Sequence, residues 1–411
     1  MKLFTRNLLL ILICCTTLNG YAAKTIRIAC VGNSITAGAR LADPSKEAYP
    51  AQLQKMLGNS YEVMNFGVSA MTVLRNCDRA YMSTSLYIKA LESDPDIVFI
   101  KLGTNDSRLP FRLQVDSFMG DYKTLIHSFK VLPSNPRIVL LLPSSSFLTD
   151  TSRQTDAAIV KYILPRIRQV AFDEKLEVID LHAITSDKQN LYPDNLHPSV
   201  EGATILAKRL FEVVTGTEKK GFDIFKKIKE PMTISSFQGY DCVNFTFEGH
   251  SCKVVKPRRA AKNLPWIWRA CSFGTNPEVD IALLDRGFHL VYCDVAELSN
   301  NQEVMFVRNA FYKKMRKSGL SSKVCLEESG CGMVNNYRWA VENPGKVACV
   351  CTDDILPMAE HTTIFEEKVK ASGKEITVIH KPDANHNPQS FANPQPIVDF
   401  ILKSVGMTPP Y

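Results

Sequence analysis

The chain has 411 residues, of which 45% are hydrophobic and 22% are charged. This ordinary globular composition excludes collagen-like, disordered and disulfide-scaffold proteins. The length predicts two domains, because a single hydrophobic core stops growing at about 250–300 residues. Lys and Arg number 49 against 42 Asp and Glu, which gives a formal charge of +7. So small an excess, without a sizeable basic block, excludes nucleic acid as the main partner.

Residues 1–23 have the pattern of a secretory signal peptide. Lys2 and Arg6 precede the apolar run Leu8–Cys15, and small residues follow before residue 24. A short basic, apolar and small-residue series of this kind directs export. No later stretch reaches the roughly 18 apolar residues that a membrane span requires. We therefore expect a periplasmic or extracellular protein without an integral membrane segment after signal removal.

Two alternatives apply to this N-terminal segment. Cys14 and Cys15 would allow a lipoprotein anchor, although Ile13 is bulkier than the residue expected before a lipid-modified Cys. The apolar run could also be a buried N-terminal helix. We favour the signal peptide over both alternatives, because the order of charges and small residues matches it throughout.

Ten cysteines follow the leader, and none of them forms a C-x-x-C pair or lies at zinc-site spacing from a His. The sequence therefore predicts no metal site. Most of these cysteines lie in apolar, strand-like runs, where a buried free thiol is expected. Cys242 and Cys252 flank a predicted hairpin and are the expected disulfide pair if the compartment is oxidising.

Short apolar runs alternate with longer amphipathic segments between residues 24 and 215. The predicted strands are Ile26–Val31, Tyr61–Phe66, Ile97–Leu102, Ile138–Leu142 and Leu176–Leu181. The predicted helices include Tyr49–Leu57, Phe118–Val131 and Asp156–Asp173. Continuously apolar strands that alternate with helices predict an α/β fold, a parallel sheet covered on both faces. Ligands of such sheets bind at the carboxyl ends of the strands.

A Lys-rich stretch at residues 216–231 is predicted to be a linker, and residues 232–411 to be a second α/β domain. The strands expected there are Tyr240–Phe247, Ser251–Val255, His289–Cys293, Lys323–Leu326, Val347–Cys351 and Thr377–His380. The helices expected there include Glu303–Lys317 and Pro396–Val405.

Residues suited to acyl transfer follow successive strands of the first domain. Ser34 follows the first strand in a turn that presents its hydroxyl, and Gly67 and Asn105 follow the second and third strands. A Ser hydroxyl needs a base and an oxyanion hole, for which a backbone N–H and a carboxamide are suitable donors. Asp194 and His197 lie near the end of the domain. Their three-residue spacing lets Asp194 orient His197 toward Ser34.

This joint pattern resembles the SGNH (GDSL-like) hydrolases over roughly residues 25–212. The resemblance implies a flavodoxin-like three-layer domain and an ester hydrolase without a metal or organic cofactor. It assigns catalysis to Ser34, His197 and Asp194. The family often has Asp before the nucleophile, whereas this chain has Asn33. That Asp carries no proton in the family mechanism, so the difference does not exclude activity.

The same resemblance implies an oxyanion hole made by the N–H groups of Ser34 and Gly67 and the carboxamide of Asn105. The segment Lys101–Ser107 looks most like the secreted carbohydrate acetylesterases of this group, which include sialate and xylan O-acetylesterases. The expected substrate is therefore an acetylated carbohydrate. The alternatives are a lipid or arylester hydrolase of the same fold and, in another class, a glycan-binding protein without catalysis.

Residues 262–405 resemble the α/β-hydrolase superfamily. Leu264–Ala270 lies where that family places its oxyanion-hole strand and loop, and Asp353 and His386 fall where its acid and base would be. The buried aromatic pair Trp266 and Trp268 is expected in the core, with stacking on sugar rings as the alternative.

The turn that carries the nucleophile in that superfamily reads G-x-S-x-G. The corresponding turn here places Gly330 at the apex, and Val347–Cys351 leads almost directly into the acid. Because the apex has no hydroxyl and the domain is shortened, we expect it to be non-catalytic. The alternative assigns the nucleophile to Ser329 or Cys331 after a local slip of the turn.

Overall fold

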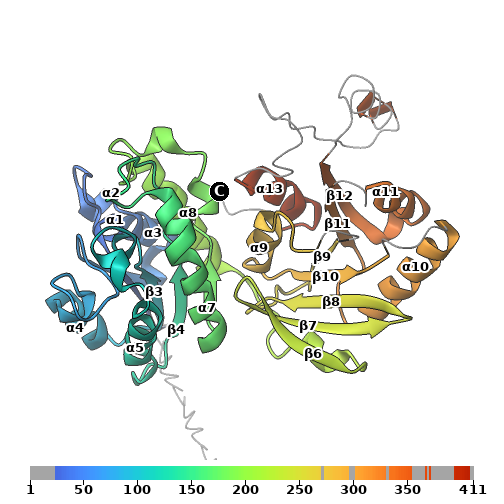
Figure 1. Ribbon diagram of the computed structural model, residues 1–411, viewed down its shortest axis with the longest axis horizontal. Helices are drawn as coiled ribbons and strands as arrows, with labels where there is room; N and C mark the ends of the chain where they lie inside the picture. Colours follow the sequence, from blue (N-terminus) through green and yellow to red (C-terminus); the bar gives the residue numbers. More distant parts are fainter. Residues whose placement is uncertain are drawn as a thin grey trace, which may run out of the picture.

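The computed structural model describes residues 24–269, 273–295, 301–329, 333–353, 366–367, 370–371 and 393–407. These residues form two α/β domains, each built around its own sheet (Figure 1). Residues 1–23, the predicted signal peptide, lie outside the described residues, as does the expected strand Thr377–His380. No helix within the described ranges combines the length and the apolar character that crossing a membrane would need.

The first sheet has five parallel strands in the order β2-β1-β3-β4-β5. The strands are β1 (Ile26–Gly32), β2 (Tyr61–Gly67), β3 (Ile97–Lys101), β4 (Arg137–Leu141) and β5 (Glu177–Ile179). The predicted parallel sheet is thus confirmed. The chain goes from β1 outward to β2 and then back across β1 to β3, so the strand order reverses at β1. Ligand sites of open α/β sheets form at such a reversal.

Helices cover both faces of this sheet. Helices α3 (Tyr49–Leu57) and α8 (Val200–Thr215) pack on one face, and α4 (Ser85–Glu92), α5 (Phe118–Lys130) and α7 (Leu164–Glu174) pack on the other. The expected single helix Asp156–Asp173 is instead a short α6 (Asp156–Ala158), a π-helical turn (Ile159–Ile163) and α7. Pro165 in the first turn of α7 has no N–H to donate, which interrupts the regular helical pattern.

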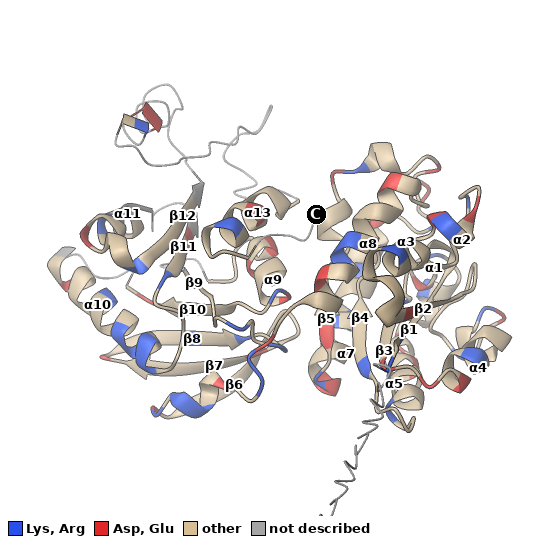
Figure 2. Ribbon diagram, turned by 180° about the vertical axis from the view of Figure 1, so that it is seen from behind, with Lys and Arg blue, Asp and Glu red and all other residues tan. Residues whose placement is uncertain are grey.

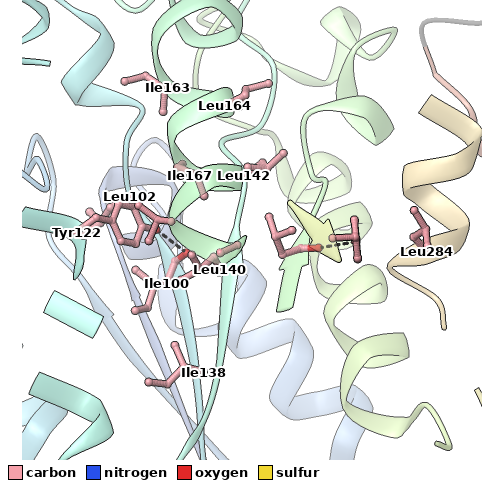
Figure 3. Close-up of a cluster of buried hydrophobic side chains, with 14 of the residues drawn as sticks. Ile100, Leu102, Tyr122, Ile138, Leu140, Leu142, Ile163, Leu164, Ile167 and Leu284 are labelled. Carbon is pink, nitrogen blue, oxygen red and sulfur yellow. Dashed lines mark hydrogen bonds between the residues drawn. The ribbon is translucent and has the colours of Figure 1, made fainter. Parts of the chain in front are cut away.

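Apolar side chains between the sheet and α7 form the core that holds the site in place. Figure 3 shows this cluster, and the labelled residues of β3, β4 and the loops after them face the start of α7. They are Ile100, Leu102, Ile138, Leu140 and Leu142 on the sheet side, against Ile163, Leu164 and Ile167. All eight are less than a tenth exposed. This buried apolar core fixes the carboxyl end of β3.

The second sheet has seven strands in the order β12-β11-β9-β10-β8-β7-β6. The antiparallel part is β6 (Met232–Phe237), β7 (Tyr240–Phe247) and β8 (His250–Lys256). The parallel part is β9 (Trp266–Arg269), β10 (His289–Cys293), β11 (Val324–Ser329) and β12 (Val347–Asp353). The helices of this domain include α9 (Glu278–Leu284), α10 (Asn301–Lys317), α11 (Met333–Glu342) and α13 (Gln395–Ser404). A second α/β domain is therefore present, with a mixed sheet.

Two features of this domain bear on its predicted inactive site. Strand β11 ends at Ser329 and helix α11 begins at Met333, so the predicted apex falls between a strand and a helix, as in a nucleophile turn. Ser329 is the last residue of β11, and its backbone is in register with Asp353 on β12. Trp266 and Trp268 are fully buried, with ring centroids 5.8 Å apart, so they belong to the core and cannot stack on a sugar.

The expected disulfide between Cys242 and Cys252 is wrong. In the β7–β8 hairpin Cys242 lies opposite Val255 and Cys252 lies opposite Phe245, so the two cysteines are three positions out of register. A disulfide needs Cα atoms within about 7 Å, which that offset prevents. Both thiols are free and buried.

The two domains contact each other through buried groups as well as through the connecting chain. Arg209 of α8 pairs with Asp285, which follows α9, at 2.6 Å, and both side chains are nearly inaccessible. The Tyr240 hydroxyl donates to the Val178 carbonyl at 3.3 Å. Basic and acidic residues are otherwise interspersed over both domains (Figure 2). Within the predicted linker, Ile224 is fully buried in the core of the second domain.

Candidate active site

Ser34 lies at the carboxyl end of β1 and begins the short helix α1 (Ser34–Ala37). Asn33 caps this helix, because its side-chain oxygen accepts a hydrogen bond from the Ile35 N–H at 3.2 Å. Gly32 lets the helix start at once, since a Cβ there would lie 2.0 Å from a side-chain oxygen of α1. The sharp strand-to-helix turn therefore presents the Ser34 hydroxyl at the edge of the sheet.

Ser34, His197 and Asp194 form a continuous hydrogen-bonded chain. His197 Nε2 lies 2.9 Å from Ser34 Oγ, and His197 Nδ1 lies 2.8 Å from Asp194 Oδ2. Both distances are within the range at which a base can take a proton and a carboxylate can orient an imidazole. The structure thus brings His197, with Asp194 beside it, to Ser34 across 163 positions of sequence.

Asp194 is held ionised by its local hydrogen bonds. Partial burial raises the pKa of its carboxyl, but bonds from the backbone N–H and the side chain of His197, together with the Leu196 N–H, hold the pKa below its usual value. An ionised Asp194 keeps a proton on His197 Nδ1 and leaves Nε2 free to accept one from Ser34. Arg40 adds a weak, solvent-exposed ion pair at 3.6 Å.

Asn105 begins a 3-10 turn directly after the loop that follows β3, and it is almost completely buried. Its Nδ2 donates to the Met71 carbonyl at 3.0 Å, and its Oδ1 accepts from Gln154 Nε2 at 2.8 Å. A carboxamide has two N–H groups, so one of them stays available for a substrate oxygen. This geometry suits the predicted role of Asn105 as an oxyanion donor.

The N–H of Gly67, which is expected to serve the oxyanion, is hydrogen-bonded to a side chain in this structure. Its N–H donates to Asn65 Oδ1 at 2.9 Å and is therefore already engaged. A Cβ at position 67 would lie 2.2 Å from the Ala37 nitrogen. Gly67 is thus required for the close approach of β2 to α1 and is not a free oxyanion donor in this structure. Asn65, only two residues earlier, makes this bond because a short amide side chain readily reaches nearby backbone N–H groups.

Ala70 lies in the loop that follows β2. It has a left-handed backbone with φ of +65°, which is uncommon for a residue with a side chain. It precedes Met71, the residue that holds the Asn105 carboxamide. In the part of the chain that the structure describes, the Ala70 N–H makes no hydrogen bond. No signal in the sequence marks an alanine for such a backbone conformation.

Gly67→Ala should destabilise the protein by about 1–3 kcal/mol or more, because the added methyl would overlap the backbone of α1. Ala70→Gly relieves a strained φ and should leave the free energy of unfolding within about 1 kcal/mol of wild type. Urea denaturation of both variants measures the two values. A Gly67→Ala protein as stable as wild type would contradict the packing role given to Gly67.

The second candidate site falls largely on residues that are not described. Gly330, Cys331 and His386 lie outside the described residues, and only the backbone of Ser329 and Asp353 is described. No group of three or more His, Cys, Asp or Glu side chains suited to a metal ion occurs among the described side chains.

Residues 30–205 match the GDSL-like lipase/acylhydrolase family. This segment is a GDSL-like lipase/acylhydrolase domain. The predicted family and ester-hydrolase class of the first domain are thereby confirmed. A relative, acetylxylan esterase of Xylanibacter ruminicola, is 37% identical over 213 residues, which cover 47% of this chain and 43% of that protein. The chain thus spans less than half the length of this relative.

Solved structures align with 46% of the chain. A carbohydrate acetylesterase family member from Sinorhizobium meliloti is 20% identical, with a TM-score of 0.39, over 46% of this chain and 97% of that one. A putative arylesterase from Agrobacterium tumefaciens is 17% identical, with a TM-score of 0.40, over 46% of this chain and 98% of that one. The α/β-hydrolase resemblance of residues 262–405 stays a prediction.

Proposed function

We propose that this protein is a serine esterase that removes O-acetyl groups from carbohydrates. The 2.9 Å contact between Ser34 Oγ and His197 Nε2, at the strand-order reversal of the sheet, is the observation that carries the proposal. A hydroxyl paired with an imidazole, which is itself paired with a carboxylate, is the arrangement of a nucleophile activated for acyl transfer.

In the proposed reaction His197 Nε2 takes the Ser34 proton while Oγ attacks the acetyl carbonyl. The Ser34 N–H and the remaining Asn105 N–H hold the oxyanion, and each donor is worth about 2.7–4 kcal/mol in such sites. The sugar oxygen leaves with the proton carried by His197. Water, deprotonated by the same imidazole, then attacks the acetyl-enzyme; the bond to Ser34 Oγ breaks, His197 returns the proton to Oγ, and acetate is released. Asp194 stabilises the imidazolium in both halves of the reaction.

Two observations support acetylated carbohydrate as the substrate. The similar acetylxylan esterase of Xylanibacter ruminicola acts, by its name, on an acetylated polysaccharide. The sequence of the segment Lys101–Ser107 resembles that of carbohydrate acetylesterases.

The composition of residues 1–23 supports export to the periplasm or the exterior, where such polymers are met. The second domain is proposed to be non-catalytic.

The purified full chain should release acetate from acetylated xylan or from O-acetylated sialoglycans. It should also prefer p-nitrophenyl acetate to p-nitrophenyl octanoate by about tenfold or more in kcat/KM, as expected of an esterase that acts on acetyl groups. Acetate release is measured enzymatically, with deacetylated polymer as control. A preference for the octanoate ester would support a lipid hydrolase instead. Polymer binding without any ester turnover would support a glycan-binding protein.

A further inference from the structure

The carboxamide of Asn105 has to be fixed in one orientation before it can serve an oxyanion. The terminal torsion of an Asn side chain is broad, so packing alone does not determine which way the amide faces. Met71 presents a carbonyl, which can only accept, so the amide nitrogen must face Met71. The amide oxygen then faces Gln154, which must present its own nitrogen, as the 2.8 Å contact shows. Two partners thus define a single orientation of Asn105.

Gln154 is itself held in place by the loop between β4 and α6. Its side chain is only 5% exposed. The next residue, Thr155, caps α6 through its hydroxyl, and on the other side the Ser152 carbonyl accepts from the Leu109 N–H at 2.9 Å. The loop is thus joined to the segment after Asn105 and to the start of α6. It returns Gln154 to Asn105 across 49 positions of sequence.

We propose that Gln154 is a positioning residue of the oxyanion hole: it orients the Asn105 carboxamide so that the free N–H points at the developing oxyanion. This inference rests on the proposed function. Gln154 touches no reacting atom and acts only through Asn105. Without it, the buried Oδ1 of Asn105 loses its donor, and the amide turns to find another one. The donor is then misplaced in the transition state, where oxyanion bonds matter most.

Two substitutions test this role. Gln154→Met keeps the length and volume but removes the donor, and Gln154→Glu keeps the shape but, when ionised, presents oxygens that only accept. Both should lower kcat for p-nitrophenyl acetate by about 10-fold to 100-fold, with KM within about threefold, because a displaced group is felt in the transition state. Gln169→Met is the matched control, since Gln169 is exposed on α7 and bonds Asp173 at 2.7 Å.

A double-mutant cycle separates positioning from packing. In an Asn105→Ala background, Gln154→Met should cause less than about a twofold further loss of kcat, because the group it positions is absent. A structural role would instead lower kcat and the melting temperature equally in both backgrounds. The inference alone would be overturned if Gln154→Met lowered kcat by the same factor in both backgrounds. It would also be overturned if the Gln154 variants kept kcat within about twofold of an active wild type. A wild type without ester turnover would overturn the proposed function and the inference with it.

Discussion

Ser34→Ala is expected to lower kcat for acetyl esters on the order of 10⁴-fold to 10⁶-fold, because no acyl-enzyme can form without the hydroxyl. The fold should survive, since Ser34 lies at the first position of a short helix and Ala is a good helix former. We expect the free energy of unfolding to stay within about 1 kcal/mol of wild type. Steady-state kinetics on p-nitrophenyl acetate, with thermal melts of the same preparations, measure both quantities.

The same variant tests whether the second domain is silent. A fluorophosphonate probe should label Ser34 alone in the wild type and no residue in Ser34→Ala, because the predicted apex Gly330 offers no nucleophile. Cys331→Ala and His386→Ala should leave turnover within about twofold of wild type for the same reason. Covalent labelling at Ser329 or Cys331 in the Ser34→Ala protein would instead show a second esterase site. More than a few per cent residual turnover in Ser34→Ala would place catalysis outside the first domain.

The sequence was sufficient for the parallel sheet and for the three residues of the hydrogen-bonded chain. Continuously apolar strands identify the sheet, and the carboxyl ends of parallel strands meet at one edge. Ser34 and His197 could therefore be placed together despite their separation. Asp194 followed from its three-residue spacing to His197, and the structure places the two side chains 2.8 Å apart.

The oxyanion hole was less predictable, because it depends on backbone conformation and on loop closure. The Gly67 N–H is engaged because the Asn65 side-chain oxygen accepts a hydrogen bond from it, a contact that residue type alone does not predict. Gln154 comes from a loop whose path is set by its contacts after folding. The register of the β7–β8 hairpin, which separates Cys242 from Cys252, likewise depends on strand pairing that spacing alone does not determine.

Lys101→Met is expected to stabilise the protein at neutral pH, although it removes a residue next to the candidate site. Lys101 is the last residue of β3, opposite Gly32, and it is completely buried. Its Nζ has no hydrogen-bond partner among the residues that the structure describes. Burial lowers the pKa of this amine to about 7. Methionine keeps the apolar stem and removes the group that resists burial.

The pH dependence follows from the direction of this pKa shift. Between about pH 7 and pH 10.5 the unfolded chain binds the Lys101 proton and the folded protein does not, so wild-type stability rises with pH across this window. Below pH 7 the folded protein carries the full cost of burying the charged Lys101 ammonium. A tenfold change in the ionisation constant corresponds to about 1.4 kcal/mol, so this cost is about 4–5 kcal/mol. The advantage of Lys101→Met should therefore be largest at pH 6–7 and nearly absent at pH 10.5.

Urea denaturation of wild type and Lys101→Met at pH 6, 7, 9 and 10.5 measures this difference directly. Lys89→Met is the matched control, because Lys89 is exposed on α4 and its replacement should change the free energy of unfolding by less than about 0.5 kcal/mol. A Lys101→Met protein that is less stable than wild type at pH 7 would mean that the ammonium is compensated in solution. An advantage that does not shrink as pH rises would assign the gain to better packing rather than to ionisation, because only the protonated amine resists burial so strongly.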